Sequence, residues 1–211
     1  MAALEKFKKH AESGRTMFLL EIDSLEDWPE ELTLAKSKRF VLFLATDATD
    51  VSNEDLAAFA VKVLDQGMVY LSTWGGDAER VHDVFEEAAA DWDPDADADT
   101  AILSEWHEDE PLSEALRFSV ADALPAHSYE GTCKATLAAI VGNPDAAERV
   151  RAWLEDPAKL ADAAEEDEKA PESGEEPVTE DDDEELDLDD DEEEGEEDDD
   201  EEDEEEPADE D

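Results

Sequence analysis

The sequence predicts a Rossmann-like α/β domain of three layers, with a mostly parallel sheet of four or five strands between two layers of helices. Short apolar runs typical of buried strands alternate with segments whose apolar residues recur at helical spacing. The links between these segments are short, which favours parallel strands joined by right-handed crossovers. Composition changes abruptly near residue 160, so we expect the core to lie before that point.

Residues 1–38 form the expected lead-in to this domain. Leu4, Phe7 and Ala11 have helical spacing, which predicts a short amphipathic helix over residues 2–13. An apolar run over residues 17–22 is short enough for a strand, and a loop follows it.

The regular part of the pattern covers residues 39–160. Residues 40–45 are continuously apolar, as expected of a strand buried on both faces. Ser52 and Asp55 have the spacing of a capping box, which predicts that a helix begins there, and Gly67 is placed to end it.

Three more strand–helix units follow. Strands are predicted over residues 68–73, 100–105 and 133–141. Asp77 is a candidate helix N-cap after a double-glycine turn, and Pro111 and Pro144 suit the first turns of the later helices. Pro157 is predicted to end the last of these helices.

Residues 161–211 are predicted to be a disordered polyacidic tail. This segment holds 35 of the 69 acidic residues and one of the 15 basic residues, which gives it a charge of −34 and leaves −20 before it. Its few large apolar side chains cannot offset the backbone entropy lost on folding, about 1–2 kcal/mol per residue.

Composition also restricts the class of protein. The lone cysteine, Cys133, rules out an intramolecular disulfide and fits a buried apolar position in a reducing compartment, so we expect a cytoplasmic protein. The negative charge argues against direct contact with nucleic acid or anionic membranes, because phosphates are bound by Lys and Arg. Basic proteins and cations remain as partners, and no sequence motif calls for a cofactor.

Candidate binding residues follow the predicted strands, because ligands of open α/β sheets bind beyond the carboxyl ends of the strands. Trp74 and Trp106 leave two of the strands at equivalent points and could form two walls of a shallow acidic pocket; packing over the end of the sheet is the other interpretation. The complete candidate set is Asp47, Asp50, Trp74, Asp77, His82, Trp106, His107, Glu108 and Asp109.

Catalytic interpretations have less support. The loop carboxylates and His107 could hold Mg²⁺ or Mn²⁺, but no recognised metal-binding spacing occurs. Ser72, Ser104 and Cys133 lie outside any nucleophile-elbow motif. The turn at residues 74–77 lacks the glycine pattern of a phosphate loop, and Asp77 would repel phosphate.

One stretch resembles a known family. Residues 106–112 read Trp-His-Glu-Asp-Glu-Pro-Leu, with Glu114 two places on, and a Trp-Gly turn lies upstream at Trp74 and Gly75. This resembles the W-H-x-D-E-P-L-x-E stretch of a bacterial family known only as a domain of unknown function. The resemblance covers roughly residues 15–143 and implies domain limits rather than a reaction. The Arg117-Phe118 pair departs from the bulkier aromatics of that pattern.

Two functions are therefore open. The first is a non-catalytic protein that recognises a basic protein partner through its acidic surface and tail. The alternative is a small metal-dependent hydrolase or phosphoester-processing enzyme that uses carboxylates at the strand ends. A separate interpretation of the tail is that it only maintains solubility, in which case deleting residues 165–211 would leave folding and function intact.

Overall fold

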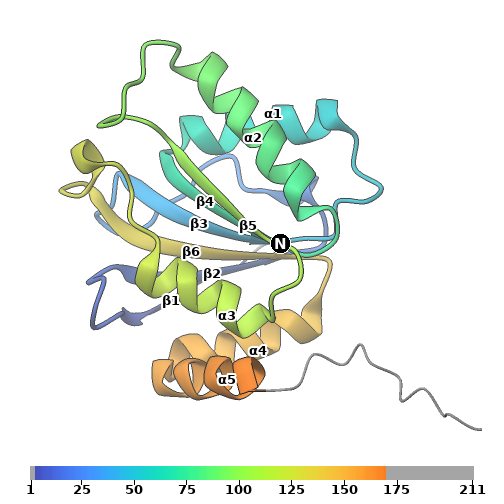
Figure 1. Ribbon diagram of the computed structural model, residues 1–211, viewed down its shortest axis with the longest axis vertical. Coiled ribbons are helices and arrows are strands. Elements are labelled where there is room, and N and C mark those ends of the chain that lie inside the picture. Colours follow the sequence, from blue (N-terminus) through green and yellow to red (C-terminus); the bar gives the residue numbers. More distant parts are fainter. Residues whose placement is uncertain (1–2, 170–211) are drawn as a thin grey trace, which may run out of the picture. The chain divides into compact units, whose positions relative to one another are not determined.

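The computed structural model describes residues 3–169, which form a six-stranded sheet in the order β1-β2-β6-β3-β4-β5 (Figure 1). β1 pairs with β2 in antiparallel fashion, and every other neighbouring pair is parallel. The predicted α/β class with a mostly parallel sheet is confirmed. The strands are β1 (Ala3–Lys9), β2 (Thr16–Ile22), β3 (Arg39–Ala45), β4 (Met68–Trp74), β5 (Leu103–His107) and β6 (Cys133–Val141).

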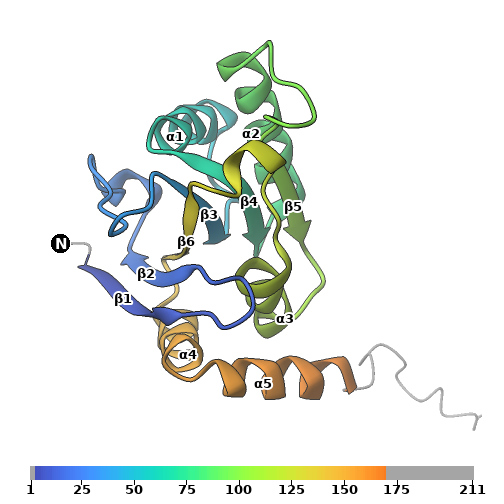
Figure 2. The same ribbon diagram turned by 90° about the vertical axis from the view of Figure 1, so that its left-hand side faces the viewer.

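Helices cover both faces of the sheet (Figures 1 and 2). One face carries α1 (Asn53–Asp65) and α2 (Ala78–Trp92). The other carries α3 (Leu112–Arg117), α4 (Pro144–Glu155) and α5 (Pro157–Lys169). Single helical turns over Leu25–Asp27, Phe118–Asp122 and His127–Tyr129 complete the set.

Each face of the sheet has its own apolar core. The α1–α2 side buries alternate residues of the central strands, such as Leu42 and Leu137, against Phe59 of α1 and Phe85 of α2. On the opposite side, residues such as Phe43 pack against α3 and α4. Central strands buried on both faces explain the unbroken apolar runs in the sequence. Cys133 is buried as expected.

The predicted N-terminal helix is wrong, because this segment forms the edge strand β1. Leu4 packs against the core on the α1–α2 side and Phe7 against the core on the α4 side. Residues three apart point to opposite faces of a strand, so each can reach a different core. The extra strand brings the sheet to six rather than four or five.

The predicted start of the first helix is confirmed. The Ser52 hydroxyl accepts a hydrogen bond from the backbone N–H of Asp55 (3.1 Å) and donates one to its carboxylate (2.6 Å). Gly67 follows the end of α1 with φ +101°, and a Cβ there would collide with the carbonyl oxygen of Lys38. A residue without a side chain is therefore required at this turn.

Buried Arg15 joins β2 to the chain that follows α3. Its guanidinium donates hydrogen bonds to the Thr136 hydroxyl (2.8 Å) and to the carbonyl oxygens of Ser119, Val120 and Ala123 (2.7–3.0 Å). Burial lowers the pKa of Arg15 from its usual value. The four acceptors disperse the charge, since a buried cation is tolerated only when it is fully hydrogen-bonded.

The last helix crosses the predicted domain boundary. Pro157 ends α4 as predicted, but it also begins α5, in which Leu160 and Ala164 are buried. The first nine residues of the predicted tail, 161–169, are thus helical, and residues 170–211 lie outside the described part of the chain. None of the helices between residues 3 and 169 combines the length and hydropathy needed to cross a bilayer.

Candidate functional site

The strand order creates one point where helices leave neighbouring strands in opposite directions. β3 and β6 lie side by side, yet β3 leads to α1 on one face and β6 to α4 on the other. The chain therefore diverges beyond the carboxyl ends of these two strands and leaves a crevice, which is where open α/β sheets bind ligands.

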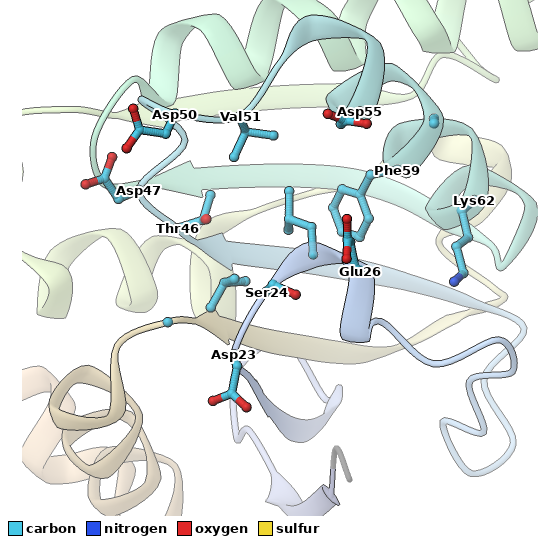
Figure 3. Close-up of a pocket in the computed structure, with 14 residues that line it drawn as sticks. Asp23, Ser24, Glu26, Thr46, Asp47, Asp50, Val51, Asp55, Phe59 and Lys62 are labelled. Atoms are coloured by element: carbon cyan, nitrogen blue, oxygen red, sulfur yellow. The ribbon is translucent and has the colours of Figure 1, made fainter.

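A pocket of about 680 Å³ lies at this crevice (Figure 3). Its floor includes the buried side chain of Phe59 and the ends of β3 and β6. We call it the switch-point pocket. Its lining residues are Asp23, Ser24, Leu25, Glu26, Thr46, Asp47, Asp50, Val51, Asp55, Ala58, Phe59, Lys62, Val141 and Gly142.

The pocket combines this apolar floor with five carboxylates. Among residues 3–169, three of them, Asp23, Glu26 and Asp50, form no hydrogen bond or ion pair. Lys62 is the single cation of the lining, and its ammonium is engaged by Glu30 (2.9 Å) and by the Trp28 carbonyl oxygen (3.0 Å). The pocket therefore has an excess of negative charge.

Asp47 is held ionised by its own loop. Its carboxylate accepts hydrogen bonds from the hydroxyl (2.7 Å) and the backbone N–H (3.1 Å) of Thr49, and these bonds lower the pKa of Asp47. The same loop is anchored by Arg80 of α2, which donates to the carbonyl oxygens of Ala48 (2.5 Å) and Val51 (3.1 Å). The β3–α1 loop is thus a preformed wall.

A smaller pocket of about 340 Å³ continues along the same edge of the sheet. It shares Thr46, Asp47, Val141 and Gly142 with the first and extends to Trp74 and Asn143. Gly75 also lines this smaller pocket. Its φ is +117°, and a Cβ at this position would collide with the Thr46 carbonyl oxygen. Gly75 of the double-glycine turn therefore serves close backbone packing.

The expectation that Trp74 and Trp106 form two walls of one pocket is wrong. β5 runs to His107 instead of ending at residue 105, so Trp106 lies within the strand and pairs with Thr73, while His107 pairs with Trp74. Adjacent residues of a strand point to opposite faces. Trp74 accordingly packs on the α3–α4 side, whereas Trp106 contacts His82 of α2.

The remaining predicted residues are scattered. Asp77 takes a left-handed backbone conformation (φ 65°) at the start of α2, and its carboxylate binds Arg80 (2.8 Å) instead of capping the helix. Glu108 and Asp109 are exposed in the turn before α3. Asp47 and Asp50 are the two predicted residues in the switch-point pocket; a binding role for any of the set stays a prediction.

His107 lies in a closed hydrogen-bonded group. Its Nε2 is 3.0 Å from the Ser72 hydroxyl and its Nδ1 is 2.8 Å from the Glu110 carboxylate, while the Trp74 indole N–H donates to the Glu110 carbonyl oxygen (2.7 Å). The order Ser–His–Glu resembles a nucleophile with its base. Ser72 is fully buried, however, so no substrate reaches its oxygen and the group is structural.

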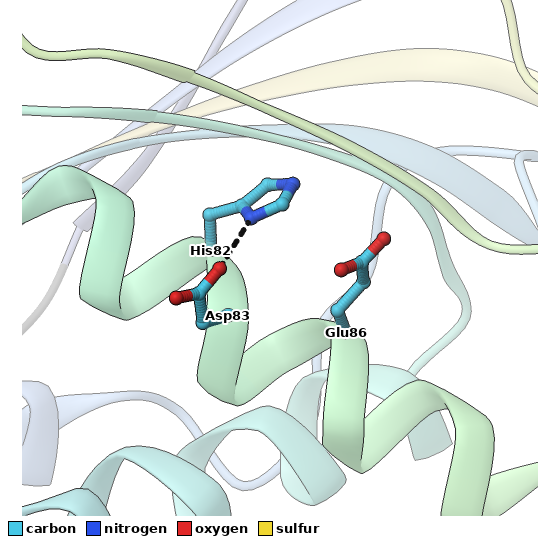
Figure 4. A group of neighbouring side chains, drawn as sticks. All are labelled: His82, Asp83 and Glu86. Carbon is cyan, nitrogen blue, oxygen red and sulfur yellow. Dashed lines mark hydrogen bonds and ion pairs between the residues drawn. The ribbon is translucent and has the colours of Figure 1, made fainter.

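The carboxylates that the hydrolase alternative would use do not converge on a shared ion site within residues 3–169. Within residues 3–169, the His, Cys, Asp and Glu side chains close enough to share an ion are His82, Asp83 and Glu86, whose ligand atoms lie within 4.8 Å of one another on α2 (Figure 4). Of these, His82 alone belongs to the predicted site. The geometry at the strand ends therefore gives the hydrolase alternative no ligand group.

Sequence reasoning missed the contribution of β2 to the pocket. Asp23 and Glu26 follow that strand directly, as Asp47 follows β3. The signal was present, because an acidic residue ends each of these apolar runs. It could be used only once the neighbours of β2 were known.

A family model described as a domain of unknown function (DUF7684) matches residues 17–157. The match begins in β2 and ends at the first residue of α5, so it contains every residue that lines the two pockets. No curated protein and no solved structure matches the chain.

Proposed function

The chain belongs to the DUF7684 family, and from this premise we propose that its domain is a non-catalytic binding module that holds a basic segment of a protein partner in the switch-point pocket. The observation that carries the proposal is the pocket itself. It lies where this topology opens the sheet, and around an apolar floor it presents carboxylates that have no hydrogen-bond or ion-pair partner among residues 3–169.

The chemistry of the pocket selects for long cationic side chains. Lys and Arg carry an apolar stem that can lie on Phe59, with a charged head that can reach Asp23, Glu26 or Asp50. A phosphate or carboxylate ligand would instead meet five carboxylates and one already engaged ammonium. The net charge of −20 over residues 1–160, which includes the pocket carboxylates, would add attraction at longer range and speed encounter with a basic partner.

The test uses the complete chain, labelled with ¹⁵N, and the acetylated tripeptide Arg-Leu-Arg as the probe. Amide signals identify where the probe binds, which separates the pocket from the polyacidic C-terminal segment. We expect shifts at Asp23, Thr46, Asp47 and Gly142 that weaken as salt is added. Signals that move only within residues 172–211 would contradict the proposal.

Matched variants test the charges. Asp23→Asn with Asp50→Asn removes two of the pocket's carboxylates that have no partner among the described residues, and we expect about tenfold weaker binding at the pocket. Asp91→Asn with Asp95→Asn makes the same change in charge on exposed residues beyond the pocket lining. Equal weakening by both pairs would show a general charge effect and sink the proposal.

A further inference from the structure

The outer edge of β5 is open. β5 is the last strand of the sheet and pairs with β4 on one side. On its other side, no backbone hydrogen bond from any residue between 3 and 169 reaches Leu103–His107. A row of backbone N–H and C=O groups is therefore available to pair with another strand.

Two large apolar side chains on this strand face solvent. Leu103 is 38% exposed and Trp106 is 43% exposed, which places both among the few exposed large apolar residues of the described chain. They lie on opposite faces of β5, and the Trp106 ring is fixed against His82 with ring centres 4.7 Å apart. An edge with apolar contacts on both faces suits an extended peptide.

The Trp106 side of this edge is negatively charged. Asp83 and Glu86 project from α2 beside His82 (Figure 4). Within residues 3–169, the Asp83 carboxylate contacts only His82 (3.2 Å), and Glu86 forms no hydrogen bond or ion pair. His82 contacts the exposed Trp106 ring on one side and belongs to the same group as the Asp83 and Glu86 carboxylates. This part of the surface therefore offers a Lys or Arg side chain both negative charge and an aromatic ring for cation–π contact.

We propose that this edge docks an extended basic segment of a partner protein, which pairs with β5 as a seventh strand and sets a Lys or Arg side chain against Trp106, Asp83 and Glu86. The basic character of the partner rests on the proposed function, but the surface differs from the switch-point pocket. A symmetric pairing with a second copy is disfavoured, because it would bring Glu105 and the same carboxylates of two strongly negative chains together.

The probe is an acetylated hexapeptide of alternating Lys and Val, added to the complete ¹⁵N-labelled chain. We expect slowed amide hydrogen exchange within residues 103–107 and a shift of the indole N–H signal of Trp106. The same peptide with every backbone nitrogen methylated keeps its charge but cannot donate backbone hydrogen bonds. Equal protection of β5 by the methylated peptide would overturn the proposal.

Variants separate charge from stacking. Asp83→Asn with Glu86→Gln is expected to weaken binding at β5 about tenfold, as is Trp106→Thr, which keeps a strand-forming residue at an exposed position. Glu87→Gln with Asp91→Asn makes the same change of charge elsewhere on α2 and serves as the control. If the control pair weakens binding equally, the proposed contact is wrong.

Other occupants give different results. Concentration-dependent self-association in sedimentation velocity, lost in Trp106→Thr, would assign the edge to a second copy and overturn the proposal. A response of Trp106 to Zn²⁺ without any response to the hexapeptide would assign the acidic group to a metal ion. The pocket pair Asp23→Asn and Asp50→Asn should leave protection of β5 unchanged, so failure of either proposal can be told from failure of the other.

Discussion

Two groups of polar residues at the same edge of the sheet differ in whether their polar atoms have partners among residues 3–169. At the ends of β4 and β5, His107 lies between Ser72 and Glu110, and these atoms are satisfied within the protein. At the ends of β2 and β3, carboxylates such as Asp23 and Asp50 face a pocket and form no hydrogen bond or ion pair with another residue between 3 and 169. The first group is satisfied within the fold, and the second is the group that our proposal assigns to a basic ligand.

The contrast teaches that chemical variety in a motif is a poor guide to binding. The Trp-His-Glu-Asp-Glu-Pro-Leu stretch contains aromatic, imidazole and acidic groups, yet it mainly fastens the end of β5 to the start of α3. The pocket contains three carboxylates, those of Asp23, Glu26 and Asp50, that have no hydrogen-bond or ion-pair partner among residues 3–169. Four predictions test this division, beginning with the buried polar contacts.

Replacing Arg15 with Ala should have the largest effect. The change leaves buried oxygens of Thr136, Ser119, Val120 and Ala123 without their donor, so we expect a loss of about 3–5 kcal/mol in the free energy of unfolding. Urea denaturation measures it. Should Arg15→Ala fail to fold, Arg15→Lys serves instead, because it keeps the charge and part of the hydrogen bonding. Its free energy of unfolding should lie between that of the unchanged protein and that expected for Arg15→Ala. A loss below about 1 kcal/mol in both variants would refute the role.

Replacing His107 with Ala should cost about 2–3 kcal/mol, because the buried Ser72 hydroxyl loses its partner and the ring loses its contact with Phe118. The same urea measurement applies. Glu110→Gln keeps an oxygen acceptor and should cost less than about 1 kcal/mol. A larger loss in the free energy of unfolding for Glu110→Gln than for His107→Ala would contradict this prediction.

Pocket carboxylates should matter little for stability. We expect Asp50→Asn to change the free energy of unfolding by less than about 0.5 kcal/mol, since this exposed side chain forms no hydrogen bond or ion pair within residues 3–169. The same variant should weaken binding of the Arg-Leu-Arg probe. A large destabilisation would mean that the pocket is a structural element like the His107 group.

The smallest effect concerns the ionisation of Asp47. Thr49→Val removes the hydroxyl donor, so the lowered pKa of Asp47 should rise towards its usual value while the backbone donor remains. The pKa of Asp47 is lower in the folded state than in the unfolded state, so its ionised form stabilises the fold when the pH is above the usual pKa of Asp. This contribution is lost as the pH falls through the lowered pKa of the folded state. Carboxyl ¹³C shifts measured against pH would report the change, and an unmoved pKa would contradict it.

Much of the fold could be predicted because its elements have strong local signals. The buried strands β3, β4 and β6 are continuous apolar runs, and α1 has a recognisable capping box. β1 could not be predicted, since Leu4 and Phe7 reach two different cores and their spacing imitates a helix. The predicted boundary near residue 160 follows from composition, and composition does not indicate that Leu160 and Ala164 of α5 are buried.

The site could be predicted only in part, because it depends on which strands are neighbours. Asp47 and Asp50 were found from their position after β3. Asp23 and Glu26 join them because β6 separates β2 from β3 by one strand, and nothing in the local sequence specifies that arrangement. The sequence predicts Trp106 just after the end of β5, whereas it lies within the strand, and this difference of two residues decides on which face its ring lies.

The placement of β6 between β2 and β3 also affects how the chain can assemble during synthesis. Until residues 133–141 have emerged from the ribosome, the β1–β2 hairpin and the β3–β4–β5 unit share no strand pairing and each exposes an open edge. Closure of the sheet joins segments far apart in sequence, a feature associated with slow folding. We therefore expect nascent chains that end before β6 to need protection from aggregation, and the complete domain to form only after β6 has emerged from the ribosome.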